Sequence, residues 1–307
     1  MKVYILQKRG LGNHFFQYAA GLFFAKKHKA TLEIIREPGE RAVSFGRPRP
    51  FLFSYYCITT PVREFTFWDR LICSVAPIKR PVASAARFAT RTAVYRQPSL
   101  MDRTFLPALP IPPSARNIYL DGNFQARQYA EDAEQHLRTE LRLREPPTGK
   151  NLETLEDIRA VETSVSLHVR RGDYGFWGGG PRVLSLDYYA QAMRALLERV
   201  RKPTFFVFSD DIPFTREHLP KSIEGARMVF VDNNDEANPH EDLRLMSACR
   251  HHIIANSTFS WWGAWLNPDP AKLVCAPMGW GLANPEEWNS DLIPPGWLLI
   301  DADIASS

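Results

Sequence analysis

The clearest pattern along the chain is an alternation of apolar and polar positions that ends in two arginines. Val165, Leu167 and Val169 recur at every second position, and Arg170 and Arg171 follow them directly. A period of two residues predicts a β-strand, and the glycine at position 172 predicts a turn after it. We therefore expect a buried strand whose carboxyl end carries two guanidinium groups.

Similar patterns alternate through the second half of the chain. Short apolar runs at 205–208, 228–231 and 253–254 predict strands, and helical periodicity appears at 187–201 and 240–249. Regular alternation of strands and helices is typical of a doubly wound α/β domain with a parallel sheet. We expect such a sheet in this half.

The first half begins in the same style and then becomes irregular. The elements predicted there are strands at 3–6, 31–35 and 118–120, a glycine turn at 10–13, and helices at 15–28 and from 125 to 140. From about residue 39 to 113, prolines, arginines and aromatic residues follow no clear period. This composition indicates short helices and long connections.

A Pro-Pro-Thr-Gly segment at 146–149 separates the two series of elements. We place a domain boundary there, between an N-terminal α/β domain of residues 1–150 and a C-terminal Rossmann-like domain of residues 151–307. A chain of 307 residues is long enough for two domains of ordinary size. This division leaves the C-terminal tail able to pack back on the first domain.

The composition is that of a globular protein, with 45% hydrophobic and 23% charged residues. A formal net charge of +4 is too small to indicate a nucleic acid partner. Aromatic residues make up 12% of the chain, and their rings often pack on sugars, so carbohydrate is a reasonable ligand class. The four cysteines are widely spaced, and we find neither a secretory leader nor an apolar run long enough to span a bilayer, so we expect a soluble, cytoplasmic protein.

One stretch of the first half is basic throughout. Between residues 70 and 100 the chain has no acidic residue, and its basic residues are Arg70, Lys79, Arg80, Arg87, Arg91 and Arg96. A solvated basic face is the ordinary explanation of such a run, and a patch for an anionic substrate or a membrane surface is the alternative. The segment is therefore compatible with peripheral association at the inner face of a membrane.

The two arginines offer suitable chemistry for binding a diphosphate. Arginine presents five donors in a planar fork that matches phosphate oxygens and stays charged at any working pH. Asp173 is close enough in sequence to hold one guanidinium in place. The alternative is a solvated charged turn, since most arginines lie at protein surfaces.

Other polar residues also fall directly after predicted strands. Asp210 and Asp211 follow one strand, and Asn256, Ser257 and Thr258 follow another. In parallel sheets, ligands bind beyond the carboxyl ends of the strands. The serine and threonine hydroxyls can cap the next helix or help to bind an anion. We expect one crevice to collect these strand ends.

Two of these segments allow more than one interpretation. Adjacent carboxylates at Asp210 and Asp211 suit a divalent cation, but two fixed arginines already neutralise a diphosphate and make a metal redundant. We favour a structural role for both aspartates. Trp261, Trp262 and Trp265 follow helical spacing, which favours a core stripe over a ligand platform.

The glycine turn before the first helix is a weak dinucleotide-like motif, because it lacks a third glycine. Gly12 permits close approach of the backbone to a ligand. His14, next to Asn13, is a residue that can titrate near neutrality, although a lone histidine is more often structural.

Together these segments resemble the α-1,2-fucosyltransferases of glycosyltransferase family 11. GLGNHFFQYA at 10–19 is similar to the family's GLGNQMFQYA, and HVRRGDY at 168–174 is similar to an arginine motif shared with α-1,6- and protein O-fucosyltransferases. DGNFQARQYAED at 121–132 and DLRLMSACRHHIIANSTFSWWGAWLN at 242–267 resemble two further family motifs. The likeness is weakest at about 40 to 115.

The resemblance implies an α/β protein of the GT-B-like class, with two facing Rossmann-like domains and a cleft between them. It also implies transfer of fucose from GDP-β-L-fucose to the 2-hydroxyl of a terminal β-galactoside, with inversion of stereochemistry. No metal and no other cofactor is implied. Its partners are the nucleotide sugar and the galactoside glycan acceptor.

By the same resemblance, Arg170 and Arg171 bind the diphosphate, and His168 and Asp242 recognise guanosine. A second group, placed near the β-phosphate and ribose, consists of Asn256, Ser257, Thr258 and Phe259. In the first domain, the implied contacts with fucose or phosphate are Gly12 and Asn13.

The chain departs from the family's pattern at His14, where the family usually has glutamine. We count Arg171, Asn13 and His14 as the catalytic candidates. The proton acceptor stays open among His14, a first-domain carboxylate and the departing phosphate, because a carboxylate beside two arginines, such as Asp173, is a poor base.

Two alternatives to this activity also stay open. One is a module that binds a sugar nucleotide without turnover. The other is a metal-dependent sugar-nucleotide transferase that uses Asp210 and Asp211.

Overall fold

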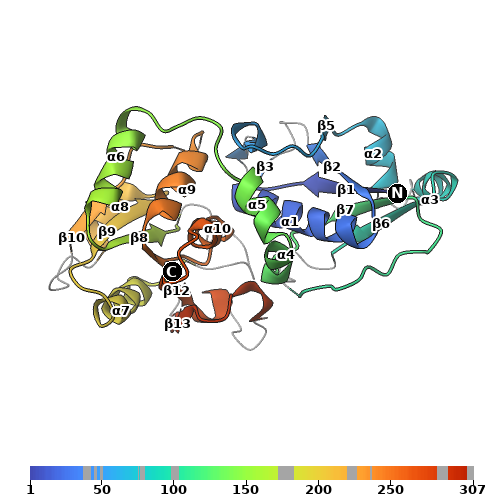
Figure 1. Cartoon of the computed structure of the whole chain (residues 1–307). Helices are drawn as coiled ribbons and strands as arrows, with labels where there is room; N and C mark the ends of the chain where they lie inside the picture. Colours follow the sequence, from blue (N-terminus) through green and yellow to red (C-terminus); the bar gives the residue numbers. More distant parts are fainter. Residues whose placement is uncertain are drawn as a thin grey trace. The chain divides into compact units, whose positions relative to one another are not determined.

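The structure is a computed structural model that describes residues 1–36, 43–44, 47–48, 51–74, 76, 80–97, 104–171, 183–219, 227–235, 237–281 and 290–302. The chain forms two compact units, unit 1 (Met1–Arg144) and unit 2 (Glu145–Ser307), whose elements are labelled in Figure 1. The sequence analysis placed the boundary after residue 150, shortly beyond this division. No helix in the described ranges is long and apolar enough to cross a membrane.

Unit 1 is built on a parallel sheet with the strand order β5-β2-β1-β7-β6. Its described strands are β1 (Lys2–Gln7), β2 (Thr31–Arg36), β5 (Val62–Glu64), β6 (Thr92–Arg96) and β7 (Asn117–Asp121), with the short antiparallel pair β3 (Val43–Ser44) and β4 (Arg47–Pro48). Its described helices are α1 (Leu11–Lys27), α2 (Phe67–Ile72), α3 (Arg80–Ala89), α4 (Arg127–Asp132) and α5 (Glu134–Glu140).

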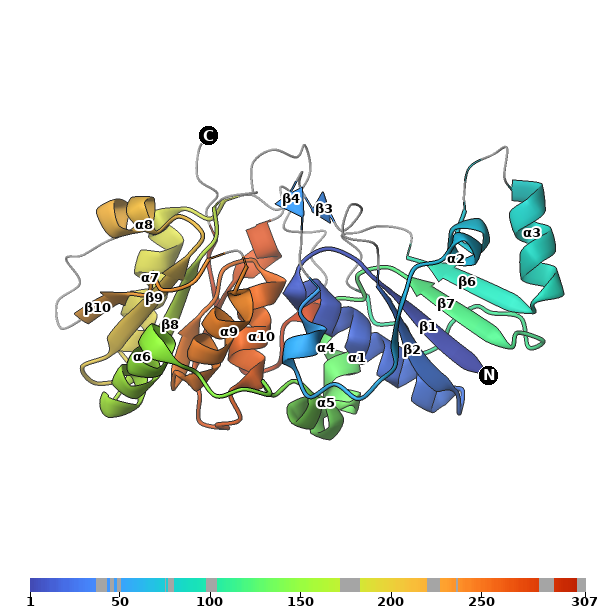
Figure 2. The same cartoon turned by 90° about the horizontal axis from the view of Figure 1, so that it is seen from above.

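The alternating side chains of β1 explain how helices cover both faces of this sheet. Ile5 lies beneath Gly21 of α1. Leu6 points the other way and packs with Ile35 and with Ile72 of α2. Helices α1 and α2 accordingly lie on opposite sides of β1 in Figure 2, as in a doubly wound sheet.

Unit 2 contains a second parallel sheet, with the order β10-β9-β8-β11-β12-β13. Its described strands are β8 (Ser164–Val169), β9 (Thr204–Ser209), β10 (Arg227–Phe230), β11 (His251–Ile253), β12 (Val274–Pro277) and β13 (Leu298–Ile300). Its described helices are α6 (Gly149–Ala160), α7 (Leu186–Leu197), α8 (Ile212–His218), α9 (Pro239–Ala248) and α10 (Thr258–Leu266).

The central strand β8 is buried along its whole length. Val165, Leu167 and Val169 pack on one face against residues of α7 that include Tyr188 and Met193. Figure 1 shows α6 and α9 on the face opposite α7. All six residues of β8 are buried, including the polar Ser166 and His168 on the second face, and the strand predicted at 165–169 is confirmed.

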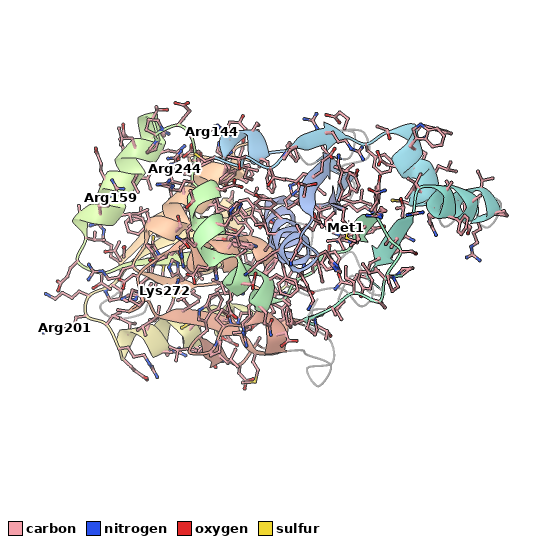
Figure 3. All side chains as sticks on the ribbon, turned by 45° about the vertical axis from the view of Figure 1, so that its right-hand side comes forward. Met1, Arg144, Arg159, Arg201, Arg244 and Lys272 are labelled. Atoms are coloured by element: carbon pink, nitrogen blue, oxygen red, sulfur yellow. The ribbon has the colours of Figure 1, made fainter. Side chains whose placement is uncertain are left out.

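Polar contacts organise the face of unit 2 that α10 covers. Ser166 Oγ lies 2.8 Å from His252 Nδ1, and His252 Nε2 lies 2.9 Å from Asn267 Nδ2. Lys272, which is labelled in Figure 3, donates to the carbonyl oxygens of Trp265 and Asn267 at the end of α10. These bonds satisfy polar groups in the interior and fix the end of α10.

Candidate active site

Three neighbouring strands of unit 2 bring the predicted donor-binding residues to one edge. Strands β9, β8 and β11 are adjacent and parallel, so their carboxyl ends meet at the same side of the sheet. Arg170 follows β8, Asp210 follows β9, and Asn256 lies shortly after β11. The expectation that these segments converge is therefore confirmed.

The two arginines are held by the two aspartates that follow β9. Arg170 Nη1 lies 3.1 Å from Asp210 Oδ2, and the backbone N–H of Arg171 donates to Asp210 Oδ1 at 2.9 Å. Arg171 Nε donates to Asp211 Oδ2 at 3.4 Å. The structural role that we favoured for both aspartates agrees with these contacts. Asp173, the predicted holder, lies outside the described residues.

Arg171 also rests on an aromatic ring. Its guanidinium carbon lies 3.3 Å from the centroid of the Phe214 ring, which α8 presents. Asp211 accepts a hydrogen bond from the backbone N–H of Phe214, so the same carboxylate fixes the helix and the arginine. Within the described ranges only Nε of the Arg171 side chain donates, which leaves both Nη atoms for a ligand. The sequence analysis missed Phe214, which lies three residues after an aspartate that can cap a helix.

His168 is buried near the end of β8, and its ring centroid lies 5.8 Å from that of Phe259. Burial and the nearby Arg170 lower its pKa to about 4, and Asp210 opposes the shift. The imidazole is therefore neutral at pH 7. No described residue pairs with its Nδ1, so this atom can form a hydrogen bond with a ligand.

The segment after β11 starts α10 through its serine. Ser257 Oγ accepts from the backbone N–H of Phe259 at 3.3 Å, and Thr258 is the first residue of the helix. Asn256 is buried and donates to the Trp280 carbonyl oxygen at 3.3 Å. Helix capping is thus one use of this segment, and its first-turn N–H groups lie at the same edge as the arginines.

The three tryptophans of α10 are core residues, as predicted. Trp261 and Trp262 are fully buried, and Trp265 is 6% exposed. Their rings pack on one another, with centroids 5.0 Å apart for Trp261 and Trp262. These rings stabilise unit 2 and do not offer an open face to a sugar.

Asp242 lies in the first turn of α9, which follows β10 and therefore starts at the carboxyl edge of the sheet. Its Oδ1 accepts from Asn234 Nδ2 at 2.7 Å. Burial raises the pKa of Asp242 to about 6, because one hydrogen bond compensates only part of the desolvation of the carboxylate. A raised pKa at a strand edge is typical of a functional site.

In unit 1, the predicted glycine turn is partly helical, which corrects the sequence interpretation. Helix α1 begins at Leu11, because the Gly10 carbonyl accepts from the backbone N–H groups of Asn13 and His14. Gly12 and Asn13 therefore lie in the first turn of α1. Asn13 Oδ1 accepts from Gln125 Nε2 at 2.6 Å, which joins the first family-like motif to the second.

His14 is buried against an aromatic cluster. Its ring lies edge-on to Phe53 with centroids 5.9 Å apart, and 6.2 Å from the centroid of Phe51. Burial lowers the pKa of His14 to about 4, and a hydrogen bond with the Arg9 backbone opposes this shift. The expectation that His14 titrates near neutrality is wrong, because its apolar surroundings disfavour the charged ring.

Arg9 is a candidate that the sequence analysis missed. It lies between β1 and α1 with a backbone φ of 73°, which few non-glycine residues adopt. Burial lowers the pKa of its guanidinium, and no described residue forms an ion pair or hydrogen bond with that group. A strained, partly buried and unpaired cation beside the start of a helix suits an anionic ligand. Arg9 lies directly before the GLGN motif at 10–13, and this position was the signal from which it could have been predicted.

A hollow of about 560 Å³ opens in unit 1 near the carboxyl ends of β2 and β5. Arg36 stacks on Phe51 at 5.4 Å and pairs with Glu64 at 3.2 Å. Arg144, labelled in Figure 3, donates to the Ile58 carbonyl oxygen. The residues that line this hollow are Arg36, Phe51, Phe53, Ser54, Ile58, Val62, Arg63, Glu64 and Arg144.

The chain matches curated relatives over part of their length. An α-1,2-colitosyltransferase of Escherichia coli is 38% identical over 162 residues, which cover 50% of this chain and 54% of that protein. The galactoside α-(1,2)-fucosyltransferase 2 of Sus scrofa is 33% identical over 145 residues, covering 43% and 41%. The chain thus spans about half the length of these relatives, or less.

A solved structure of similar fold is that of NodZ α-1,6-fucosyltransferase soaked with GDP-fucose. The likeness covers 87% of this chain and 92% of NodZ, with a TM-score of 0.53 and 15% sequence identity. The predicted GT-B-like class, with two Rossmann-like α/β domains, is confirmed by this likeness and by the two parallel sheets. The family model of glycosyl transferase family 11 matches residues 99–300, and the chain belongs to this family.

Proposed function

We propose that this protein transfers fucose from GDP-β-L-fucose to the 2-hydroxyl of a terminal β-galactoside, with inversion and without a metal. The observation that carries the proposal is the arginine pair after β8, held by Asp210 and Asp211 with both Nη atoms of Arg171 open. The relatives that act on galactosides and colitose, and the NodZ structure soaked with GDP-fucose, support the donor and linkage.

The arginine pair suits the departure of a nucleoside diphosphate. As the bond between the fucosyl carbon and the β-phosphate oxygen breaks, the leaving GDP gains negative charge and the sugar gains oxocarbenium character. Guanidinium groups that are fixed before the reaction stabilise this charge without reorganising. Inversion follows when the acceptor oxygen attacks the opposite face of the sugar.

Guanosine recognition is assigned to His168 and Asp242. A neutral imidazole with an unpaired Nδ1 can accept or donate one hydrogen bond, according to its tautomer. Guanine presents two neighbouring N–H donors, which a carboxylate such as that of Asp242 accepts. Phe259, whose ring packs against His168, supports the ribose side of the same site.

Metal independence is supported by the partners of the two aspartates. Both Asp210 and Asp211 already pair with arginines, so a divalent cation would have to displace a guanidinium from each.

We assign the acceptor sugar to the hollow of unit 1. The ring of Phe51, which lies over the buried Phe53, can pack on the apolar face of galactose, and Arg36 and Glu64 can form hydrogen bonds with its hydroxyls. Phe53 also contacts His14, so the hollow adjoins the start of α1.

The proton of the acceptor hydroxyl is assigned to the departing diphosphate. His14 is a weak base, because burial lowers its pKa to about 4. Glu64 lines the hollow, but its charge is already paired with Arg36. His14 and Asn13 remain predicted contacts of the sugar, together with Arg9, which we add to the site.

A cytoplasmic location is part of the proposal. Cys57, Cys73, Cys249 and Cys275 are all free thiols, which suits a reducing compartment.

A second donor is favoured by the colitosyltransferase match, which is 38% identical. Colitose resembles fucose but lacks the 3-hydroxyl group. A site built for fucose with a hydrogen-bond partner for that hydroxyl discriminates against colitose, whereas an apolar site does not. The two donors must therefore be compared in the same assay.

The deciding experiment incubates the protein with GDP-fucose or GDP-colitose, a panel of β-galactosides and excess EDTA, and determines the product linkage by NMR. We expect an α-1,2-linked product from GDP-fucose at full rate in EDTA. GDP binding without product would favour the binding module, and activity restored only by a divalent cation would favour the metal-dependent alternative. Faster transfer from GDP-colitose than from GDP-fucose would show that GDP-colitose is the donor.

A further inference from the structure

Helix α3 exposes an apolar face in unit 1. Ala83 is buried, whereas Val82 and Phe88 are 56% and 88% exposed. The exposed apolar residues recur with helical spacing on one side of the helix, within roughly a third of a turn. They are Pro81, Val82, Ala85, Phe88 and Ala89. An apolar stripe of this kind normally packs against the core of a domain, whereas this stripe of α3 is exposed.

The neighbouring helix α2 extends the same kind of surface. Phe67 and Trp68 in its first turn are 71% and 65% exposed. Arg87 of α3 donates from Nε to the Ile72 carbonyl oxygen at 2.7 Å and from Nη2 to that of Ser74 at 3.0 Å. These bonds cap the end of α2 and fix the two helices to one another. Figure 2 shows α3 at one end of unit 1, next to the edge strand β6.

The exposed charged residues of α2 and α3 are all basic. The chain has no acidic residue from Arg70 to residue 100. Asp69, just before this stretch, is buried and paired with Arg63. Arg70 and Arg91 are exposed; Arg70 follows Phe67 and Trp68 within α2, and Arg91 lies just after the end of α3. Apolar and aromatic side chains beside arginines are the composition of helices that lie in a membrane interface.

We propose that this α2–α3 surface, formed by the exposed residues of α2 and α3 with Arg70 and Arg91, docks on a bilayer of anionic lipids. Phe88 and Val82 then enter the boundary between headgroups and acyl chains, while the arginines contact lipid phosphates. The proposal concerns where the protein acts, and it stands whether or not the transfer reaction is confirmed.

A second copy of the chain fits this surface less well. A two-fold contact through α3 would place the arginines of one copy against those of the other, with no carboxylate between residues 70 and 100 to neutralise them. An anionic lipid surface neutralises the same arginines.

The experiment measures co-sedimentation of the full chain with vesicles of phosphatidylcholine alone or with 30% phosphatidylglycerol. We expect binding to the anionic vesicles that high salt weakens. The double substitution Val82→Ser/Phe88→Ser should weaken partitioning by at least about tenfold. Arg70→Gln and Arg91→Gln should each weaken it by about fivefold.

Matched controls lie on exposed sites of unit 2. Leu152→Ser/Leu299→Ser removes two apolar side chains, and Arg159→Gln/Arg201→Gln removes two of the charges labelled in Figure 3. These controls should partition like the unaltered protein, and all variants should keep its melting temperature. Absence of binding to the anionic vesicles, or equal binding by Val82→Ser/Phe88→Ser, would overturn the proposal. A dimer that this variant disrupts would also overturn it in favour of self-association.

Discussion

Arg171 is held by three different contacts, and each fixes a different part of the residue. Asp210 accepts its backbone N–H, Asp211 accepts Nε, and the Phe214 ring lies beneath the guanidinium plane. A side chain that is already ordered loses little entropy when it binds a ligand. The geometry of Arg171 therefore favours a phosphate-binding site that is formed before the ligand binds.

Replacement of Arg171 by lysine tests this grip. Lysine keeps the charge but loses the planar fork, so we expect kcat/KM for transfer to fall by about 100-fold, in line with the loss of a fixed electrostatic contact. The measurement is steady-state kinetics on protein shown to be folded by circular dichroism. Arg159→Lys, on the exposed end of α6, is the control. Near-normal turnover of Arg171→Lys would rule out the phosphate assignment.

Asp242 provides a test by pH. Its pKa is raised to about 6 by burial, so the free protein holds a neutral carboxyl group below that pH. If the carboxylate binds guanine, the affinity for GDP-fucose should fall by about tenfold from pH 7 to pH 5, because only about a tenth of the groups remain ionised.

GDP-fucose is the right probe for this test, since both of its phosphates stay ionised over that range. Calorimetric titration at several pH values measures the effect. The variant Asp242→Asn should bind more weakly at pH 7 and show no such dependence on pH. An equal pH dependence in both proteins would show that another group titrates.

The candidate binding residues could be predicted better than the residues that hold them. The pair Arg170 and Arg171 stands out in the sequence, because a strand pattern ends there. Its holders Asp210 and Asp211 come from the next strand of the sheet, and only the pairing of β8 with β9 brings them together. Spacing along the chain pointed to Asp173, which is near in sequence. Contacts between strands depend on register, which single-sequence patterns do not contain.

At the scale of elements, strands β1, β8 and β9 and helices α1 and α7 were predicted because their periodicity is strong, whereas β12 and α6 were not predicted. Two edge strands were not predicted: β5 and β13 are three residues long in the described structure, too short to show a period. The helix expected to run to residue 140 is two helices, α4 and α5, which meet at Ala133. Nothing among the described contacts explains this break.

The loop after β7 joins the two family-like motifs of unit 1 and tolerates no side chain at Gly122. A Cβ there would lie 2.5 Å from Gln97 Cβ. Gln97 Oε1 accepts from the backbone N–H groups of Asn123 and Phe124, which hold the loop that carries Gln125. Close packing of this loop thus supports the Gln125–Asn13 bond.

Substitution of Gly122 by alanine should therefore destabilise the protein by about 1–3 kcal/mol through overpacking. Urea denaturation measures the free energy of unfolding. Gly10→Ala is the control for the steric clash, because a Cβ at Gly10 meets no atom within 4 Å; we expect a smaller cost there, about 0.5–1 kcal/mol, because alanine is a poorer N-cap than glycine. Equal stability of the two variants would contradict the packing argument.

At the scale of the whole molecule, the chain passes from unit 1 to unit 2 once, between Arg144 and Glu145. Each sheet is complete within its own unit, with strands β1 to β7 on one side of this point and β8 to β13 on the other. Units of this kind have their own cores and can unfold separately.

Scanning calorimetry should therefore resolve two transitions. GDP at about 100 times its dissociation constant stabilises the unit that binds it by about 2.7 kcal/mol, so only the transition of unit 2 should move, upward by about 5 °C or more. A fragment of residues 145–307 should show the same shift, which identifies the transition. A single transition, or an equal shift of both, would show that the units unfold together.

The single passage between the units also bears on how genes of this family diversify. A recombination joint near codon 145 replaces one whole sheet and leaves every strand of the other in its original register. The donor is assigned to unit 2 and the acceptor to unit 1. A protein encoded by such a recombinant gene therefore takes its donor specificity from one parent and its acceptor specificity from the other.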